Sequence, residues 1–202
     1  SGQQEGLSFV NTDMVESVDF SAGGFDAMYG DKMSSVLDIR YKRPMAFESR
    51  LNISMLGASA YFGWGDSVQS QMHGIRYKTS KYMLGALDTK GNYKPNFLDY
   101  QTQMTWKIGE KEQNDRTWEL KLLGNFSQNS YEFTPDSAAT DFGGMDAKEQ
   151  IIYHEGQEKD IFRTAFVALS ANGKVHPEVK VGVNLSGFYT HEQETYDIRS
   201  EY

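Results

Sequence analysis

The feature that most constrains the fold of this chain is a long alternation of polar and apolar residues. It is clearest in the segments 99–108, 117–127 and 178–190. An alternation of period two places successive side chains on opposite faces of a β-sheet, so each segment predicts a strand with one apolar and one polar face. The apolar rows are Tyr100, Met104, Trp106 and Ile108; Trp118, Leu120, Leu122 and Phe126; and Val179, Val181, Val183, Leu185 and Tyr189. The polar rows are Asp99, Gln101, Gln103 and Lys107; Glu119, Lys121, Asn125 and Ser127; and Lys180, Asn184, Ser186 and Thr190.

Weaker strand patterns cover 50–63, 67–83 and 160–171, and no segment shows the spacing of an amphipathic helix. Strands of globular proteins are most often about five or six residues long. The strands predicted here reach about ten residues, the length that crosses a bilayer at a tilt of about 45°. Strand length therefore favours a membrane barrel over a small soluble sheet.

The spacers between these segments differ in length. Those at 109–116 and 172–178 are short and turn-like, whereas 84–96 and 131–159 are long, polar and contain glycine. Short turns at one rim and long loops at the other are typical of outer-membrane barrels. A barrel wall also accounts for a chain that is 13% aromatic with a mean hydropathy of −0.60, because only one face of each strand meets lipid and aromatic rings gather at the membrane interfaces.

Composition and motifs exclude several other classes. The absence of Cys removes thiol nucleophiles and thiolate metal sites, and the formal charge of −8 without a basic patch argues against a nucleic-acid partner. No run of 18 apolar residues predicts a transmembrane helix. His154-Glu155 and His191-Glu192 begin a His-Glu-x-x-His motif, but the second His is missing in both. We therefore expect no enzymatic activity, no cofactor and no bound metal.

The segment 11–44 (NTDMVESVDFSAGGFDAMYGDKMSSVLDIRYKRP) has a different pattern. Residues 15–20 and 36–41 alternate as two short strands, and the glycines between them, such as Gly23-Gly24, supply turns with positive φ. We expect a compact strand-turn-strand unit that carries the charges of Glu16 and Arg40.

This segment resembles the C-terminal end of the plug domain of TonB-dependent outer-membrane receptors, where a VESVEVLKGG…A.YG…SSVIDIRTK pattern precedes the first barrel strand. The matching residues are Val15, Glu16, Ser17 and Val18; Gly23, Gly24 and Phe25; Ala27; Tyr29 and Gly30; Ser34, Ser35 and Val36; and Asp38, Ile39 and Arg40. The chain departs from the pattern at Ser21-Ala22 and at Gly30-Asp31-Lys32. Downstream stretches such as LGASAYFGWGD and FLDYQTQMTWKI are similar to early barrel strands of the peptidase-regulatory-like subgroup. The resemblance therefore covers nearly the whole chain.

The resemblance implies an all-β fold, namely a fragment of an antiparallel transmembrane β-barrel of about 22 strands, preceded by the end of an α/β plug domain. It divides the chain into the C-terminal part of the plug, 1–44, and the N-terminal barrel strands, 45–202. Taken alone, these strands would form an open, curved sheet with an exposed apolar face and unpaired edges.

The same resemblance implies a transporter in the cell outer membrane, surrounded by outer-membrane lipid. TonB would act through the N-terminal part of the plug and use the proton-motive force to open a path for a bound nutrient. Iron chelates, cobalamin, glycans and peptides are all candidate nutrients, and a surface lipoprotein is a candidate partner.

Two sets of site residues follow from the resemblance. Glu16 and Arg40 are expected to hold the plug against barrel-wall charges, because an unpaired buried charge is costly; the alternative is that both are solvated strand charges. Residues in or next to the two long spacers are expected to touch the nutrient, although an aromatic girdle or loop packing would also explain the aromatic ones. They are Tyr82, Asp88, Tyr93, Tyr131, Phe133, Phe142 and His154.

Alternation and composition also fit a soluble antiparallel sandwich or solenoid with one solvent-exposed face. The functional alternative is then a soluble or surface-attached β-rich module that binds carbohydrate, and a structural adhesion protein is a third class. A membrane channel requires the row of Trp118, Leu120 and Leu122 to face outward and Glu119 and Lys121 to face an enclosed passage. A soluble module would bury the first row in its own core.

Overall fold

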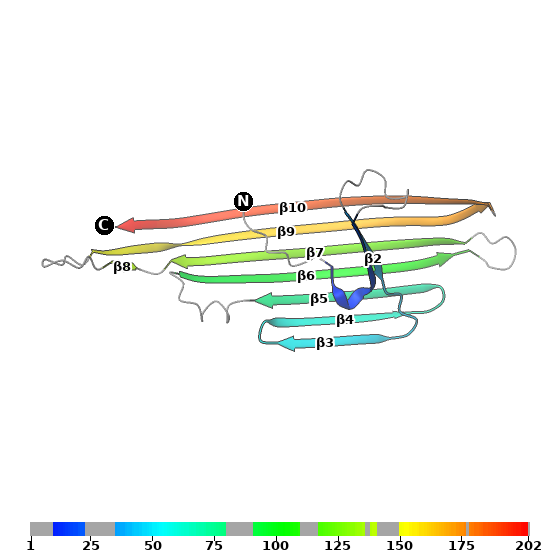
Figure 1. The fold of residues 1–202 in the computed structure, drawn as a ribbon, viewed down its shortest axis with the longest axis horizontal. Helices are drawn as coiled ribbons and strands as arrows, with labels where there is room; N and C mark the ends of the chain where they lie inside the picture. Colours follow the sequence, from blue (N-terminus) through cyan, green and yellow to red (C-terminus); the bar gives the residue numbers. More distant parts are fainter. Residues whose placement is uncertain are drawn as a thin grey trace.

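The computed structural model describes residues 10–22, 35–79, 91–109, 117–135, 138–140, 150–176 and 178–201 (Figure 1). These residues form antiparallel strands and one short 3-10 helix, which confirms the predicted all-β class. No helix among them is long and apolar enough to cross a membrane. The elements are η1 (Thr12–Met14), β1 (Val15–Ala22), β2 (Ser35–Tyr41), β3 (Glu48–Ser54), β4 (Gly57–Gly65), β5 (Gln69–Thr79), β6 (Gly91–Ile108), β7 (Trp118–Pro135), β8 (Ala138–Thr140), β9 (Gln150–His176) and β10 (Val179–Glu201).

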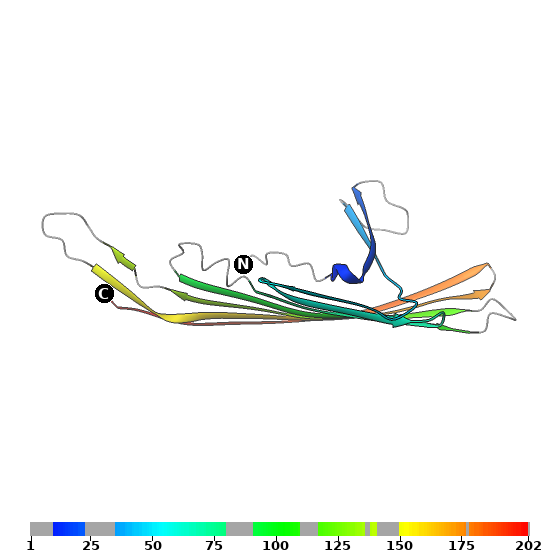
Figure 2. The same cartoon turned by 90° about the horizontal axis from the view of Figure 1, so that it is seen from below.

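Two sheets are present. β1 and β2 pair only with each other and confirm the two short strands predicted between 15 and 41. The remaining strands form one large sheet in the order β10-β9-β7-β6-β5-β4-β3, with β8 paired to β9. The large sheet is open and shallowly curved, and η1, β1 and β2 lie on one side of it (Figure 2).

The large sheet has two faces of opposite chemistry. We call the face on which η1 lies the polar face; one row across its strands is Tyr61, Gly74, Gln101, Asn125, Phe166 and Phe188. We call the opposite side the apolar face; one row across it is Ala60, Ile75, Tyr100, Phe126, Ala165 and Tyr189. The rows predicted for the three clearest segments fall on these two faces as expected, because side chains alternate strictly along a strand.

Burial is inverted relative to a soluble β-protein. Among the described residues, the buried non-glycine side chains of the large sheet lie on the polar face, with His73 as the exception; they are Tyr61, Ser70, Met72, Phe97, Asp99, Gln101, Thr105 and Asn125. On the apolar face, by contrast, Ile75 is 45% exposed, Leu169 50% and Leu185 66%. The small core of the described chain thus lies between the polar face and the N-terminal segment.

The segment 50–63, predicted as a single strand, is a hairpin made of β3 and β4. Its turn falls at Met55 and Leu56, which are apolar residues rather than the usual turn formers, so the sequence pattern did not reveal it. Gly57 follows with a φ of 143°. A Cβ there would lie 2.0 Å from the Tyr77 carbonyl oxygen, so glycine is required at this position.

The two long spacers are shorter than predicted. β6 begins at Gly91, within 84–96, and β7 and β9 extend into 131–159 from both sides, to Pro135 and from Gln150. The stretches 91–96 (GNYKPN) and 150–159 (QIIYHEGQEK) lack a regular alternation of polar and apolar residues, so the sequence pattern did not reveal the strands there. The backbone ladder nevertheless continues, because strand pairing depends on main-chain hydrogen bonds and not on side-chain polarity.

Candidate functional site

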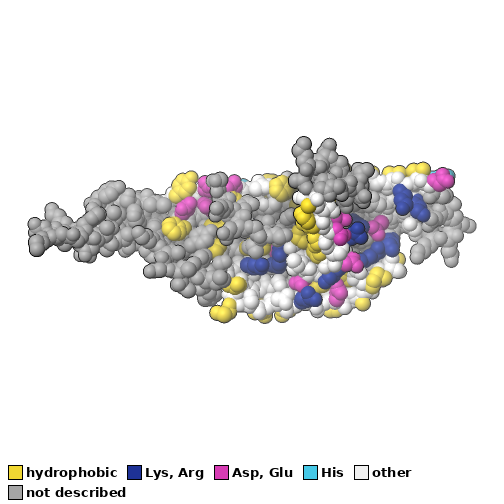
Figure 3. Space-filling view, in the orientation of Figure 1, with side chains coloured by type: hydrophobic (Ala, Val, Ile, Leu, Met, Phe, Trp, Pro, Cys, Tyr) yellow, Lys and Arg dark blue, Asp and Glu magenta, His cyan; other side chains and the backbone are white. Residues whose placement is uncertain are grey.

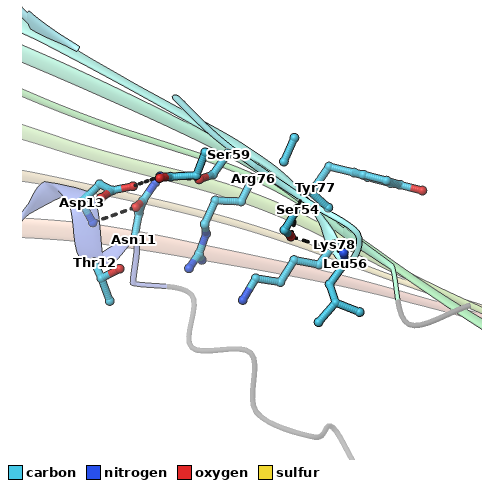
Figure 4. A pocket seen from close by; sticks show the side chains of 12 residues that line it. Asn11, Thr12, Asp13, Ser54, Leu56, Ser59, Arg76, Tyr77 and Lys78 are labelled. Atoms are coloured by element: carbon cyan, nitrogen blue, oxygen red, sulfur yellow. Dashed lines mark hydrogen bonds between the residues drawn. The ribbon is translucent and has the colours of Figure 1, made fainter. Parts of the chain in front are cut away.

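The N-terminal segment Val10–Met14 lies directly against the polar face, where β4, β5 and β6 pass beneath it (Figure 4). Asn11 caps η1: its side-chain oxygen accepts a hydrogen bond from the backbone N–H of Asp13 at 3.0 Å. The backbone N–H of Met14 closes the turn on the Asn11 carbonyl oxygen at 3.1 Å. This local turn fixes which side chains of the segment point to the sheet.

Met14 is the apolar anchor of the segment. Its side chain is fully buried and packs with Tyr61 and Met72 of the polar face, with Tyr41 of β2 alongside. Full burial of one methionine side chain contributes about 1.5–3 kcal/mol. Lys42 adds a cation–π contact, with Nζ 5.4 Å from the centre of the Tyr61 ring.

Arg76 and Asp99 form a buried ion pair beneath this segment. Nε of Arg76 donates to both carboxylate oxygens of Asp99, at 2.9 and 3.1 Å, and the Nη2 group makes a further contact to the same carboxylate. The Asp99 side chain is 1% exposed and that of Arg76 11%. Nη1 of Arg76 also donates to the Val10 carbonyl oxygen at 3.2 Å. The pair therefore links β5 and β6 of the large sheet to the backbone of the N-terminal segment.

Gln101 makes a second link of the same kind. Its Oε1 accepts from the backbone N–H of Asn11 at 2.8 Å, and its Nε2 donates to the Tyr41 hydroxyl at 2.9 Å. Burial raises the pKa of Tyr41, and the hydrogen bond from Gln101 partly offsets this rise. Gln101 is fully buried, so one residue of β6 holds both η1 and β2 in place.

Asp13 joins the edge of the sheet to the segment. Its carboxylate accepts from Arg50 at 2.7 Å and from Asn52 at 3.4 Å, while its carbonyl oxygen accepts from Lys42 Nζ at 2.8 Å. The Arg50 side chain is 59% exposed, so this ion pair is worth about 0–1 kcal/mol. It orients the segment more than it stabilises it.

A second polar contact involves the connection between β2 and β3. Arg43 pairs with Glu119 of β7 at 3.2 Å, and Lys121 pairs with the same carboxylate at 2.8 Å. Figure 3 shows charged side chains of both signs gathered beside the N-terminal segment on this side of the sheet. The polar rows predicted on β6 and β7 thus supply the groups that bind the N-terminal part of the chain.

Beside η1 the polar face has an open hollow of about 400 Å³. Its walls come from η1 and the strands β3, β4 and β5, and present amide, hydroxyl, carboxylate and cationic groups (Figure 4). The lining residues are Asn11, Thr12, Asp13, Asn52, Ser54, Leu56, Gly57, Ala58, Ser59, Arg76, Tyr77 and Lys78. Among the described residues, no three His, Asp or Glu side chains come together as metal ligands.

Gly74 lets the segment Val10–Met14 approach the polar face closely, and Gly74→Ala is expected to weaken this contact. A Cβ at position 74 would lie 2.2 Å from Asn11 Nδ2 and 3.2 Å from Met14 Sδ, both buried. We expect a loss of about 1–3 kcal/mol in the free energy of unfolding, typical of overpacking, measured by denaturant titration of the detergent-folded protein. Gly187→Ala is the matched control, because a Cβ there meets nothing within 4 Å. Equal losses in the two variants would contradict the close contact.

The residues predicted to touch a nutrient fall into three groups. Tyr82, Asp88 and Phe142 lie outside the described residues. Tyr93 and His154 lie in β6 and β9 rather than in loops, with only their backbone described; Tyr93 is opposite Phe133 in the ladder.

Tyr131 and Phe133 are half-buried on the polar face of β7. Tyr131 packs edge to face on Phe162 of β9 at a ring separation of 6.0 Å. The register thus brings Tyr93, Tyr131 and Phe133 to one end of the sheet, and their contact with a nutrient stays a prediction.

Glu16 and Arg40 lie in the two-stranded sheet. Arg40 pairs with Asp38 at 3.6 Å and with Asp19 at 3.9 Å, and Glu16 is exposed at a register irregularity of β1. In the described residues, the contacts to the large sheet come instead from Val10–Met14, from Tyr41 at the end of β2 and from the residues that follow it. A role for Glu16 and Arg40 against other parts of a wall stays a prediction.

Sequence reasoning placed Asp99 and Gln101 on the polar face. It did not predict that these two residues form a site with Arg76, Asn11 and Met14. The ion pair crosses two strands, and the contact to Asn11 spans 90 residues, so no local pattern encodes it. The available signals were Asn11 as a helix cap and a glycine two residues before Arg76. No protein-family model, no curated protein and no solved structure matches this chain.

Proposed function

We propose that this chain belongs to a TonB-dependent outer-membrane receptor and acts in the energised uptake of a nutrient. In this proposal η1, β1 and β2 are the end of the plug, and β3 to β10 are barrel strands whose polar face lines the lumen. The sequence resemblance of segment 11–44 motivates the family. The two-faced sheet, which receives that segment on its polar face, supports it.

The observation that carries the proposal is the inverted burial of the large sheet. The polar face buries an ion pair and several amides against the N-terminal segment, while large aliphatic side chains of the apolar face stay exposed, such as Val183 at 51% and Leu185 at 66%. Soluble monomers rarely expose a continuous apolar surface of this extent. Lipid is the environment that covers such a face without a second protein layer.

All three tryptophans of the chain lie on the apolar face, near one rim of the sheet. Trp64 is next to the last residue of β4, Trp106 is close to the end of β6, and Trp118 begins β7. Indole rings prefer the boundary between membrane and water, where the ring is in apolar surroundings and the N–H meets polar groups. Their common position supports a membrane interface at this rim.

The height of the apolar face also fits an outer membrane. On β7 this face is apolar from Trp118 to Phe126 and becomes polar at Gln128. At about 3.3 Å per residue, the stretch from Trp118 to Gln128 measures about 33 Å along the strand. A tilt of about 40° reduces this to about 25 Å, the height of the apolar band of outer-membrane barrels.

The edge of the apolar face at the tryptophan rim does not follow a single row across the strands. On β4 it ends at Trp64, which shares a row with Leu185 of β10. On β10, Val183 and Val181 extend the apolar face beyond that row, toward the start of the strand. A stepped edge is expected when strands are tilted relative to the membrane normal, as in closed barrels.

In the described residues, β3 and β10 each pair with a strand on one side only. Open edges of this length would pair with other strands or aggregate. The proposal closes the barrel by pairing both edges with further strands of the receptor. TonB then pulls on the plug, while the buried contacts of Arg76, Gln101 and Met14 hold the last plug segment to the wall.

The proposal predicts that Trp106 lies at the membrane interface. In a variant that retains Trp106 as its only tryptophan, reconstituted in vesicles, bromines attached near the lipid headgroup are expected to quench its fluorescence more than bromines at the chain terminus. The physical reason is the position of Trp106 near the rim of the apolar face. Protection from all brominated lipids would contradict a lipid-facing position.

Transport is tested by uptake. Cells that produce the full-length protein are expected to accumulate its nutrient only when TonB and the proton-motive force are intact, and the protein is expected in the outer-membrane fraction. A full-length product that stays monomeric at high concentration without detergent would instead favour the soluble or surface-attached carbohydrate-binding module.

A further inference from the structure

The hairpin of β1 and β2 is fastened to the large sheet at its open end, where the chain enters and leaves it. Val10–Met14 precede β1, and we call them the entry segment; residues 41–44 end β2 and follow it, and we call them the exit segment. Beyond this end the hairpin rises away from the sheet (Figure 2). Phe20 and Leu37, for example, are more than half exposed. The hairpin therefore depends on its open end for its position.

The entry segment is held by residues of β5 and β6 that lie beneath it. The Val10 carbonyl oxygen accepts a hydrogen bond from Arg76 at 3.2 Å, and the backbone N–H of Asn11 donates to Gln101 at 2.8 Å. Gly74 allows this approach, since a Cβ there would lie 3.1 Å from Asn11 Cγ. Because backbone groups of two successive residues are bound, a pull along the chain loads both hydrogen bonds together.

The exit segment contacts the same face of the large sheet. Arg43 forms an ion pair with Glu119 of β7 at 3.2 Å. Pro44 is buried on β4: a Cβ at Gly63 would lie 2.6 Å from Pro44 Cγ, and a Cβ at Gly65 would lie 2.5 Å from the Pro44 carbonyl oxygen. Glycine at these two positions leaves room for the chain to approach. The exit segment is thus held by β4 and β7.

The two segments are also joined to each other. The backbone N–H of Lys42 donates to the Met14 carbonyl oxygen at 2.9 Å, and Lys42 Nζ donates to the Asp13 carbonyl oxygen at 2.8 Å. Gln101 connects them a third time, because its amide binds the entry segment and the Tyr41 hydroxyl. We call the two segments, with their contacts to each other and to the large sheet, the clasp.

The clasp lies where a pull from the N-terminal side reaches the hairpin. Both chain ends of the hairpin leave from its open end, so such a pull would part β1 from β2 one rung at a time, starting at Val15 and Tyr41. Parting the strands in this way requires little force, because few hydrogen bonds carry the load at any moment. The ladder is also irregular there, between Val15 and Ser17. Contacts that hold the entry segment before the first rung therefore keep the load off the hairpin.

We propose that the clasp is a fixed mechanical stop in transport. TonB displaces the plug only as far as Val10, and residues 10–44 stay on the polar face while the nutrient passes. The inference rests on the proposed function, because it requires a pull on the plug. Its consequence is that the path for the nutrient opens beside residues 10–44 and not through their removal.

The first test closes the clasp with a disulfide in the full-length protein. This chain contains no Cys, so an introduced pair meets no competing thiol within it. Asn11→Cys with Gly74→Cys places a sulfur where Asn11 Cγ lies, 3.1 Å from the Cβ of residue 74. Pro44→Cys with Gly63→Cys brings two Cβ atoms to about 3.3 Å, near the lower end of disulfide geometry. The second pair serves if the first does not fold.

We expect TonB-dependent uptake by each tethered protein to stay within about twofold of the same protein after reduction, with tether formation checked by thiol labelling. The matched controls are the single variants Asn11→Cys and Pro44→Cys. Uptake that is blocked by either tether and restored by a reductant would overturn the clasp as a fixed stop. Absence of TonB-dependent uptake in the unmodified protein would instead overturn the proposed function.

The second test pulls on the N-terminus of the full-length protein in a bilayer and measures the length of chain released. We expect the unmodified protein to resist further extension once the force reaches Val10. Arg76→Met combined with Gln101→Leu removes both hydrogen bonds of the entry segment. Release of residues 10–44 in this variant would add up to about 120 Å, at about 3.4 Å per residue. An equal released length in the two proteins would overturn the clasp.

Discussion

Arg76→Met is expected to lower the free energy of unfolding by about 3–5 kcal/mol, the usual cost of removing one partner of a buried ion pair. Asp99 is 1% exposed, so its carboxylate would be left charged and unpaired in the protein interior. The Val10 carbonyl oxygen would lose its Arg76 donor at the same time. The effect is measured by denaturant titration of the full-length protein in detergent, with protease accessibility near Val10–Met14 as a second readout.

Two further variants make this result specific. Arg163→Met is the control, because Arg163 is exposed on the apolar side of β9 and donates only a hydrogen bond to Gln128 at 2.9 Å among the contacts described; we expect a change below about 1 kcal/mol. The double variant Arg76→Met with Asp99→Leu should recover much of the loss, since an apolar pair of similar volume is often tolerated. Similar losses for Arg76→Met and Arg163→Met would mean that the ion pair does not stabilise the contact between the large sheet and Val10–Met14.

Leu122→Arg is expected to reduce the free energy of folding into a bilayer by about 2–4 kcal/mol, the cost of arginine on the lipid face near the membrane midplane. Leu122 lies in the middle of the apolar stretch of β7, in the row of Met104, Leu169 and Leu185. The measurement is urea titration of the full-length protein folded into vesicles, followed by tryptophan fluorescence.

Leu123→Arg is the control, because it changes the adjacent residue on the polar face. Gln103, its partner in the ladder, lies on that face and carries a buried amide oxygen that can accept a hydrogen bond from the new guanidinium. We therefore expect a clearly smaller loss than for Leu122→Arg. If the two substitutions cost the same, or if Leu123→Arg costs more, the apolar face does not meet lipid.

Much of the fold follows from local pattern. The rows of β6, β7 and β10 are assigned to the correct faces because the side chains of a strand alternate strictly. The hairpin of β3 and β4 and the extended ends of β6, β7 and β9 could not be predicted in the same way. In the first case an apolar pair, Met55 and Leu56, forms the turn, and in the second the sequence of 91–96 and 150–159 does not alternate regularly between polar and apolar residues.

The site followed from the sequence only in outline. Asp99, Gln101 and Glu119 were placed on the polar face, but their partners Arg76, Asn11 and Arg43 were not identified. Gln101 meets Asn11 across 90 residues of chain, and Glu119 meets Arg43 across 76. Pairs of this kind depend on which strands become neighbours and in what register, and one sequence does not contain that information.

The sequence by itself determined that this protein is built from long strands with one polar and one apolar face, because polar and apolar residues alternate along the chain. Only the tertiary structure decided that Val10–Met14 is held on the polar face and that His73 is buried among aromatic rings on the other. The physical reason is that alternation is a property of one strand, whereas burial arises where several strands and a distant segment meet.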